Sequence, residues 1–91
     1  MEFASFNINS YVYLEMKHSD FVLWKEHYDR YLPESMQSDL SYYRNKADKE
    51  TGFVSMQMHE YMKVFGPHIG LGNPVPCGTT LRFNTKDIQI K

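Results

Sequence analysis

The sequence predicts a small α+β domain in which antiparallel strands and hairpins pack against two main helices. Short segments alternate apolar and polar residues with the period of a half-buried strand, and between them apolar residues recur at helical spacing. The chain has 91 residues without an internal repeat or a linker, so we expect residues 1–91 to form a single domain. Seven Tyr, six Phe, six Met and one Trp provide large side chains for its core.

The first strand is predicted over residues 8–16. Val12 and Leu14 alternate there with Tyr11 and Tyr13, which places both tyrosines on the wetter face. A helix is predicted over residues 21–32, because Phe21, Trp24 and Tyr28 fall on one face. Ser19 or Asp20 would cap this helix, and Pro33 would end it.

The segment from residue 34 to residue 43 is ambiguous between a short helix and a turn. We expect it to lead into a strand over residues 42–46, which would form a hairpin across the polar turn 47–52. Strand periodicity then runs from Val54 and helical periodicity runs to Phe65. Both are satisfied if the strand ends near Val54, Ser55 caps a helix, and Gly66 closes that helix in the left-handed conformation.

Residues 66–78 contain four of the five glycines and three of the four prolines. A loop of this length in a small domain is often functional, although a stiff connection is the simpler interpretation. Two further strands are predicted over residues 79–83 and 88–90, joined as a hairpin by the turn 84–87.

Charge and cysteine content narrow the function classes. Ten basic and eleven acidic residues are spread evenly along the chain, so no basic face is expected to hold duplex nucleic acid. Cys77 is the only cysteine, which excludes an internal disulfide and favours a reducing compartment. No secretory signal and no apolar run of about 20 residues is recognisable. We therefore expect a soluble cytoplasmic protein without a membrane partner.

Catalytic and metal-binding patterns are weak. His59-Glu60 begins like a zinc-protease helix motif, but Lys63 stands where the second histidine would be needed. Cys77 and His68 are the best nucleophile and base available, and nothing in the sequence guarantees activation of the thiol. We expect no catalytic residue, no metal and no cofactor, with an enzyme built on Cys77 and His68 as the last-ranked alternative.

Binding fits the composition better, since Tyr and Met exceed what a core of this size needs and both are typical of contact surfaces. A small anionic ligand held by the Gly/Pro loop, with help from His68, Lys63 and Arg82, is one alternative, and base stacking on residues 42–46 is another. Surplus apolar surface also makes a homo-oligomer plausible. The candidate partner- or ligand-binding residues are Tyr11, Tyr13, Tyr42, Tyr43, Arg44, His68, Asn73 and Arg82.

Three segments, INSYVYL at residues 8–14, WKEHY at residues 24–28 and MHEYMKVFGPHI at residues 58–69, resemble short proteins encoded in bacteriophage and prophage early regions. The resemblance covers about half the chain and transfers no site residue. It implies an accessory protein that acts in a bacterial cytoplasm by stoichiometric binding. The leading hypothesis is a non-enzymatic inhibitor of a host defence protein, comparable to an anti-CRISPR. The alternatives are a sponge for a nucleotide-like signal and a nucleic-acid-binding regulator.

Overall fold

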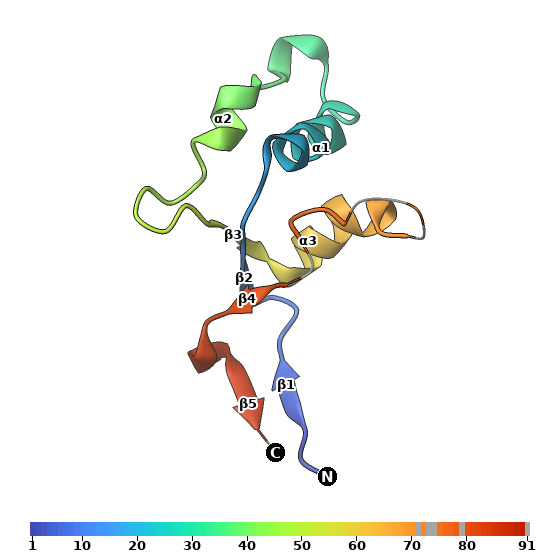
Figure 1. Cartoon of the computed structure of the whole chain (residues 1–91). Coiled ribbons are helices and arrows are strands. Elements are labelled where there is room, and N and C mark those ends of the chain that lie inside the picture. The colour runs from blue at the N-terminus through green and yellow to red at the C-terminus, as the bar shows by residue number, and fades with distance from the viewer. Residues whose placement is uncertain (71, 73–74, 79, 91) are drawn as a thin grey trace.

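In a computed structural model the chain folds into helices and antiparallel strands, which confirms the predicted α+β class (Figure 1). The structure describes residues 1–70, 72, 75–78 and 80–90. The elements along the chain are β1 (Ala4–Phe6), β2 (Tyr11–Leu14), α1 (His18–Asp29), the 3₁₀ turn η1 (Glu34–Met36), α2 (Leu40–Arg44), β3 (Val54–Gln57), α3 (Met58–Phe65), η2 (Gly66–His68), β4 (Arg82–Phe83), η3 (Thr85–Asp87) and β5 (Ile88–Ile90).

A three-stranded antiparallel sheet with the order β3-β2-β4 forms the centre of the fold. Val12 lies opposite both Met56 and Phe83, and Leu14 lies opposite Val54. These side chains point to one face because strand residues alternate between the two faces of a sheet. Val12 and Leu14 are fully buried there, so this inner face supports the core.

Helix α1 begins three residues earlier than predicted and ends at Asp29. Lys17 occupies the N-cap position, and the carboxylate of Asp20 in the first turn accepts a hydrogen bond from the Lys17 backbone N–H at 2.8 Å. The prediction of Ser19 or Asp20 as the N-cap was therefore wrong, although Asp20 does stabilise the start of the helix. Its acidic charge there also complements the helix dipole.

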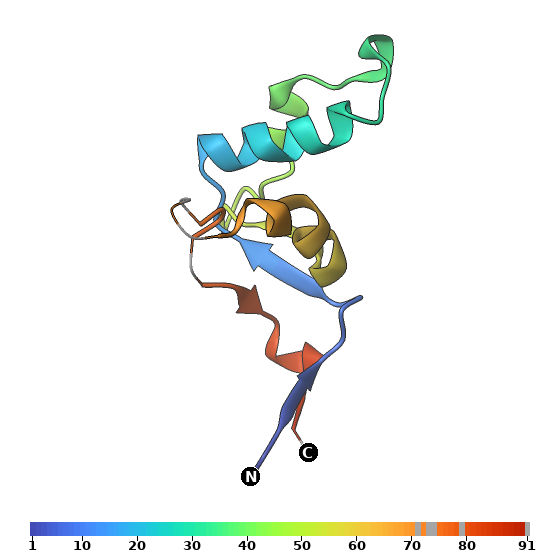
Figure 2. The same cartoon turned by 90° about the vertical axis from the view of Figure 1, so that its right-hand side faces the viewer.

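Helix α3 follows β3 directly and packs on the inner face of the sheet, with α1 packed against α3 (Figure 2). The backbone N–H groups of Met58 and His59 donate to the carbonyls of Ser10 and Ile8, at 2.9 and 3.0 Å, so the turn before β2 replaces a side-chain cap. The prediction that Ser55 caps this helix was wrong, because Ser55 lies inside β3.

The predicted end of α3 at Phe65 is confirmed, but the prediction that Gly66 adopts the left-handed conformation was wrong. Gly66 has φ −51° and continues the right-handed turn into η2. Left-handed backbone is found further along, at Gly72, Gly78 and Cys77, whose φ is 59°. The side chain of Cys77 is 3% exposed, and its burial in the core accompanies a backbone conformation that a non-glycine residue rarely adopts.

The strand predicted over residues 42–46 was also wrong, because these residues belong to α2 and the turn after it. The Asp39 carboxylate caps α2 by accepting from the backbone N–H of Tyr42 at 3.2 Å. The helix then places Tyr43 against Trp24 of α1, where the side chain of Tyr43 is buried. The alternative of a short helix in this region was the correct one.

The last two strands do not form the predicted hairpin. β4 pairs with β2, whereas β5 pairs with β1, a strand that the sequence did not predict. The turn η3 between them is fixed by Asn84, whose side chain accepts from the Lys86 backbone N–H at 3.0 Å. Figures 1 and 2 show the β1–β5 pair below the three-stranded sheet and away from the helices, with both termini at its tip.

The core lies between the inner sheet face, α1, α2 and α3. Its buried apolar side chains are Val12, Leu14, Phe21, Trp24, Tyr43, Val54, Met56, Tyr61, Val64, Phe65 and Cys77. Within the described part of the chain, no helix is both long and apolar enough to cross a bilayer.

Candidate functional site

The predicted site residues separate into three places. Tyr11, Tyr13 and Arg82 lie on the outer face of the sheet, Tyr42 and Tyr43 lie on α2, and His68 lies at the end of η2. Arg44 is exposed on α2. Asn73 lies outside the described residues.

The outer sheet face brings together three of the predicted residues. Arg82 lies directly across from Tyr13, and Tyr11 on the same strand is 50% exposed. The Arg82 guanidinium is 3.3 Å from the Glu15 carboxylate and 4.6 Å from the centre of the Phe53 ring. Its charge is thus already paired by this chain, which makes it a weak anchor for a separate anion.

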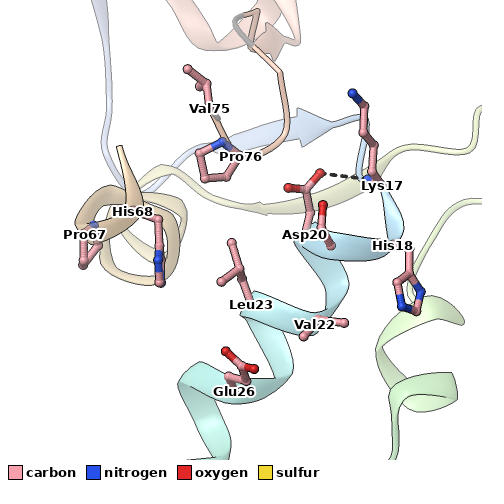
Figure 3. Close-up of a pocket in the computed structure, with 11 residues that line it drawn as sticks. Lys17, His18, Asp20, Val22, Leu23, Glu26, Pro67, His68, Val75 and Pro76 are labelled. Atoms are coloured by element: carbon pink, nitrogen blue, oxygen red, sulfur yellow. Dashed lines mark hydrogen bonds between the residues drawn. The ribbon is translucent and has the colours of Figure 1, made fainter. Parts of the chain in front are cut away.

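The Gly/Pro segment borders a groove of about 610 Å³ at the start of α1 (Figure 3). Figure 3 shows Leu23 of α1 pointing toward Pro76 across the groove. Pro67 and His68 line the groove from a separate segment, η2. Two carboxylates also line the groove, that of Asp20 beside Lys17 and that of Glu26 further along α1. Arg82 and Lys63, which were expected to help His68 hold an anion, are not among the residues that line the groove.

Cys77 lines a different hollow, together with Lys17 and Arg82, and is not among the residues that form the groove with His68. Desolvation by burial, assisted by the negative charge of Asp20, raises the pKa of the Cys77 thiol to about 12. A nucleophilic cysteine needs the opposite effect, a pKa lowered toward neutrality.

Tyr42 and Tyr43 line a further cavity, of about 360 Å³, between α1, α2 and the first turn of α3. We call it the aromatic pocket, because four of its eight residues are Trp or Tyr. Trp24 and Tyr28 come from α1, where a spacing of four places them on one face. The complete lining is Trp24, Tyr28, Leu32, Ser38, Tyr42, Tyr43, Lys46 and Glu60.

Ring packing holds the walls of the aromatic pocket. The Trp24 and Tyr43 rings meet edge to face with centroids 5.2 Å apart, and the Tyr42 and Tyr43 rings do so at 5.3 Å. This is a favourable aromatic geometry. Trp24 and Tyr43 are 7% and 5% exposed, whereas Tyr42 is 50% exposed. The inner walls are therefore fixed in the core, and Tyr42 forms the rim.

Polar groups lie among these rings. The Tyr28 hydroxyl donates a hydrogen bond to Glu60 Oε1, and burial followed by the Glu60 carboxylate raises the pKa of the Tyr28 phenol. The nearby Trp24 side chain opposes that rise in the pKa of Tyr28. The indole N–H of Trp24 is buried and makes no hydrogen bond with any of the described residues. The Lys46 ammonium lies 4.5 Å from the centre of the Tyr42 ring.

Sequence reasoning missed Trp24, Tyr28, Lys46 and Glu60 as pocket residues. Trp24 and Tyr28 were assigned to the core face of α1. Trp24 is indeed buried in the core, whereas Tyr28 is only partly buried and lines the pocket. The signal that was available is the spacing of four between Tyr42 and Lys46, which favours a cation–π contact in a helical turn. The prediction of a strand over residues 42–46 gave this spacing no meaning, because the side chains of residues four apart do not touch on a strand.

Among the described residues, no group of three or more His, Cys, Asp or Glu side chains is placed to hold a metal ion. No protein-family model matches the chain, and neither a curated protein nor a solved structure is significantly similar to it.

Proposed function

We propose that this chain acts without catalysis, by stoichiometric binding of a protein partner. The aromatic pocket receives a planar side chain, aromatic or arginine, from that partner. One observation carries the proposal: Trp24 and Tyr43 are locked in the core while Tyr42 stands half exposed beside them at an open cavity.

Pre-ordered aromatic walls suit such a role for two physical reasons. Their side chains are already immobile, so little conformational entropy is lost when a partner binds. Aromatic rings also bind other rings and guanidinium groups face on, and Trp, Tyr and Arg dominate binding energy at protein interfaces. The Lys46 ammonium already lies 4.5 Å from the centre of the Tyr42 ring, a position typical of a cation–π contact.

The resemblance to phage accessory proteins makes a bacterial defence protein the first partner to test, with the binding event in the host cytoplasm. In this proposal the chain inhibits that protein by occupying its surface, in the manner of an anti-CRISPR.

The chain offers a matched pair of variants to test the site. Tyr42 and Tyr11 are the same residue type and each is 50% exposed, but Tyr42 lies at the aromatic pocket and Tyr11 on the outer sheet face. Affinity capture from bacterial extract should identify a partner that wild type and Tyr11→Ala retain in a fixed molar ratio. Tyr42→Ala should weaken that complex at least tenfold in titration calorimetry. Loss with Tyr11→Ala and retention with Tyr42→Ala would reject the pocket as the site.

A nucleotide-like ligand is the second candidate, and the position of Lys46 favours it. A base could stack on the aromatic walls, while the ammonium at the rim would meet a phosphate. Protein purified without added ligand should then show excess absorbance at 260 nm, and a nucleotide should appear in its mass spectrum. Titration of cyclic and linear nucleotides into wild type and Lys46→Ala separates this candidate from protein binding. Affinity for a nucleotide that is unchanged in Lys46→Ala would reject this arrangement.

A further inference from the structure

The β1–β5 pair, which we call the ribbon, has one apolar face. Ala4 lies opposite Ile90 and Phe6 opposite Ile88. Because alternate strand residues share a face, these four side chains point to the same side. Ser5 and Gln89, which lie opposite each other, point to the other side. The ribbon is therefore amphipathic, although it stands clear of the helices (Figure 2).

This apolar face is only partly covered, because Phe6 and Ile88 are half-buried whereas Ala4 and Ile90 are exposed. Ile90 is 72% exposed, and the packing of the Phe6 and Phe83 rings, with centroids 4.4 Å apart, joins the ribbon to the sheet. Among the described residues no third strand pairs with β1 or β5. An isolated two-stranded ribbon is only marginally stable in water, so a face like this one gains from being covered.

The ribbon has few of the features that keep free strand edges apart. Monomeric proteins protect such edges with charged residues, proline, bulges or very short strands, and of these β1 and β5 have the short length, three residues each. The six residues of β1 and β5 are Ala, Ser and Phe, and Ile, Gln and Ile, so none is charged and none is proline. Pairing with an identical ribbon would consequently bury no charge from either strand.

The whole chain exposes more surface than a compact monomer of the same mass. A compact monomer of 10.8 kDa exposes roughly 5,500 Å². This chain as a whole exposes 6802 Å², about 1,300 Å² more, and the excess is spread over the elongated molecule, of which the ribbon is one part. A standard protein interface takes about 800 Å² from each partner. The radius of gyration, 14.6 Å, likewise exceeds the roughly 12 Å expected for a compact chain of this length.

We propose that this chain forms a symmetric dimer in which the ribbons of two copies pack through their apolar faces. A second copy fits because the face is uncharged, and a two-fold axis would set Phe6, Ile88 and Ile90 against their equivalents. Face-to-face packing closes after two copies, whereas pairing through both free edges would continue without limit. The proposal is independent of the aromatic pocket, which lies among the helices.

Light scattering on a sizing column tests the dimer with a matched pair of variants. Ile90 and Gln89 are exposed neighbours on β5 whose side chains point to opposite faces of the ribbon. Wild type should elute with twice the 10.8 kDa mass of the chain. Ile90→Lys should elute with the mass of one chain, because two-fold packing would bury like charges. Gln89→Lys should remain a dimer.

The remaining outcomes contradict the proposal. A wild-type monomer at millimolar concentration would show that a second copy does not cover this face. Assemblies larger than two would indicate edge pairing. Dissociation by Gln89→Lys with retention by Ile90→Lys would place the contact on the other face of the ribbon. Far-ultraviolet circular dichroism of both variants would show that neither substitution unfolds the domain.

Discussion

The hydroxyl of Tyr28 on α1 donates a hydrogen bond to the carboxylate of Glu60 on α3, across 32 positions of sequence. The two helices pack against each other, and both residues of this polar contact are partly buried. It also forms part of the aromatic pocket, since both residues line that cavity. The shape of the pocket therefore depends on the spacing of α1 and α3 as well as on its rings.

Tyr28→Phe removes only the hydroxyl of this contact. A hydrogen bond to a charged acceptor contributes about 1.5–3 kcal/mol when buried, and the partial exposure of both residues reduces this, so we expect a loss of about 1 kcal/mol. Urea unfolding followed by tyrosine and tryptophan fluorescence measures it. Tyr31→Phe is the control, because Tyr31 is 71% exposed and should change the free energy of unfolding by less than about 0.5 kcal/mol. Equal effects of the two substitutions would show that the contact does not stabilise the fold.

His27 makes the domain sensitive to mild acid. Desolvation lowers the pKa of its buried imidazole below the usual 6.5, and the positive charges of Lys63, Arg30 and His68 lower it further, while Glu60 opposes them. The unfolded chain then binds more protons than the folded chain in the range just below pH 6.5. The contribution of His27 is fully present above that value and is lost as the pH falls through this range.

Chemical unfolding at pH 7.5 and pH 5 should consequently give a smaller free energy of unfolding at pH 5. His27→Phe keeps a ring against Tyr28 and Tyr31 and cannot be protonated, so it should lose less stability across this interval than wild type. His59→Gln, at an exposed position, should behave as wild type does. An identical pH dependence in wild type and His27→Phe would assign the acid sensitivity to other groups.

Cys77 should react slowly in the folded protein. Its thiol is buried and has a pKa of about 12, so the thiolate is scarce at pH 8. Alkylation by iodoacetamide, followed by mass spectrometry, should be at least a hundredfold slower in buffer than in concentrated urea. Labelling in buffer at the rate of a free thiol would contradict this environment and would reopen the role of Cys77 as a nucleophile.

Phe65 should contribute more to stability than any exposed residue of α3. Its side chain is fully buried, and Phe→Ala substitutions in cores cost about 3–5 kcal/mol. Met62 on the same helix is 45% exposed, so Met62→Ala serves as the control, with an expected change below about 1 kcal/mol. Thermal unfolding by circular dichroism measures both. A small effect of Phe65→Ala would indicate that α3 is not packed on the sheet.

Local patterns predicted the parts of the fold that local physics decides. The alternation around Val12 and Leu14 and the helical spacing of Phe21 and Trp24 both correspond to real elements, because each pattern buries one face. Strand partners depend on tertiary contacts, and for that reason β4 and β5 were wrongly joined as a hairpin. The β1 strand has three residues, too few for a period to be recognised.

The candidate site was predicted only in part, for a related reason. Tyr42 and Tyr43 were selected for their chemistry, and both line the aromatic pocket. Glu60 reaches the same cavity from α3, and no local pattern links it to residues of α1 and α2. Its contribution depends on the packing of α3 against α1, which sequence spacing does not encode.

The dimer makes a thermodynamic prediction that is separate from its mass. A folded dimer in equilibrium with unfolded chains is favoured by mass action, so its Tm should rise with protein concentration. Calorimetry of wild type at concentrations a hundredfold apart should show that rise, and Gln89→Lys should show it too. Ile90→Lys should give the same Tm at both concentrations, because its charge sits on the apolar ribbon face that a second copy would cover. A wild-type Tm that does not depend on protein concentration would mean that folded chains do not associate, and that the apolar face of the ribbon stays exposed.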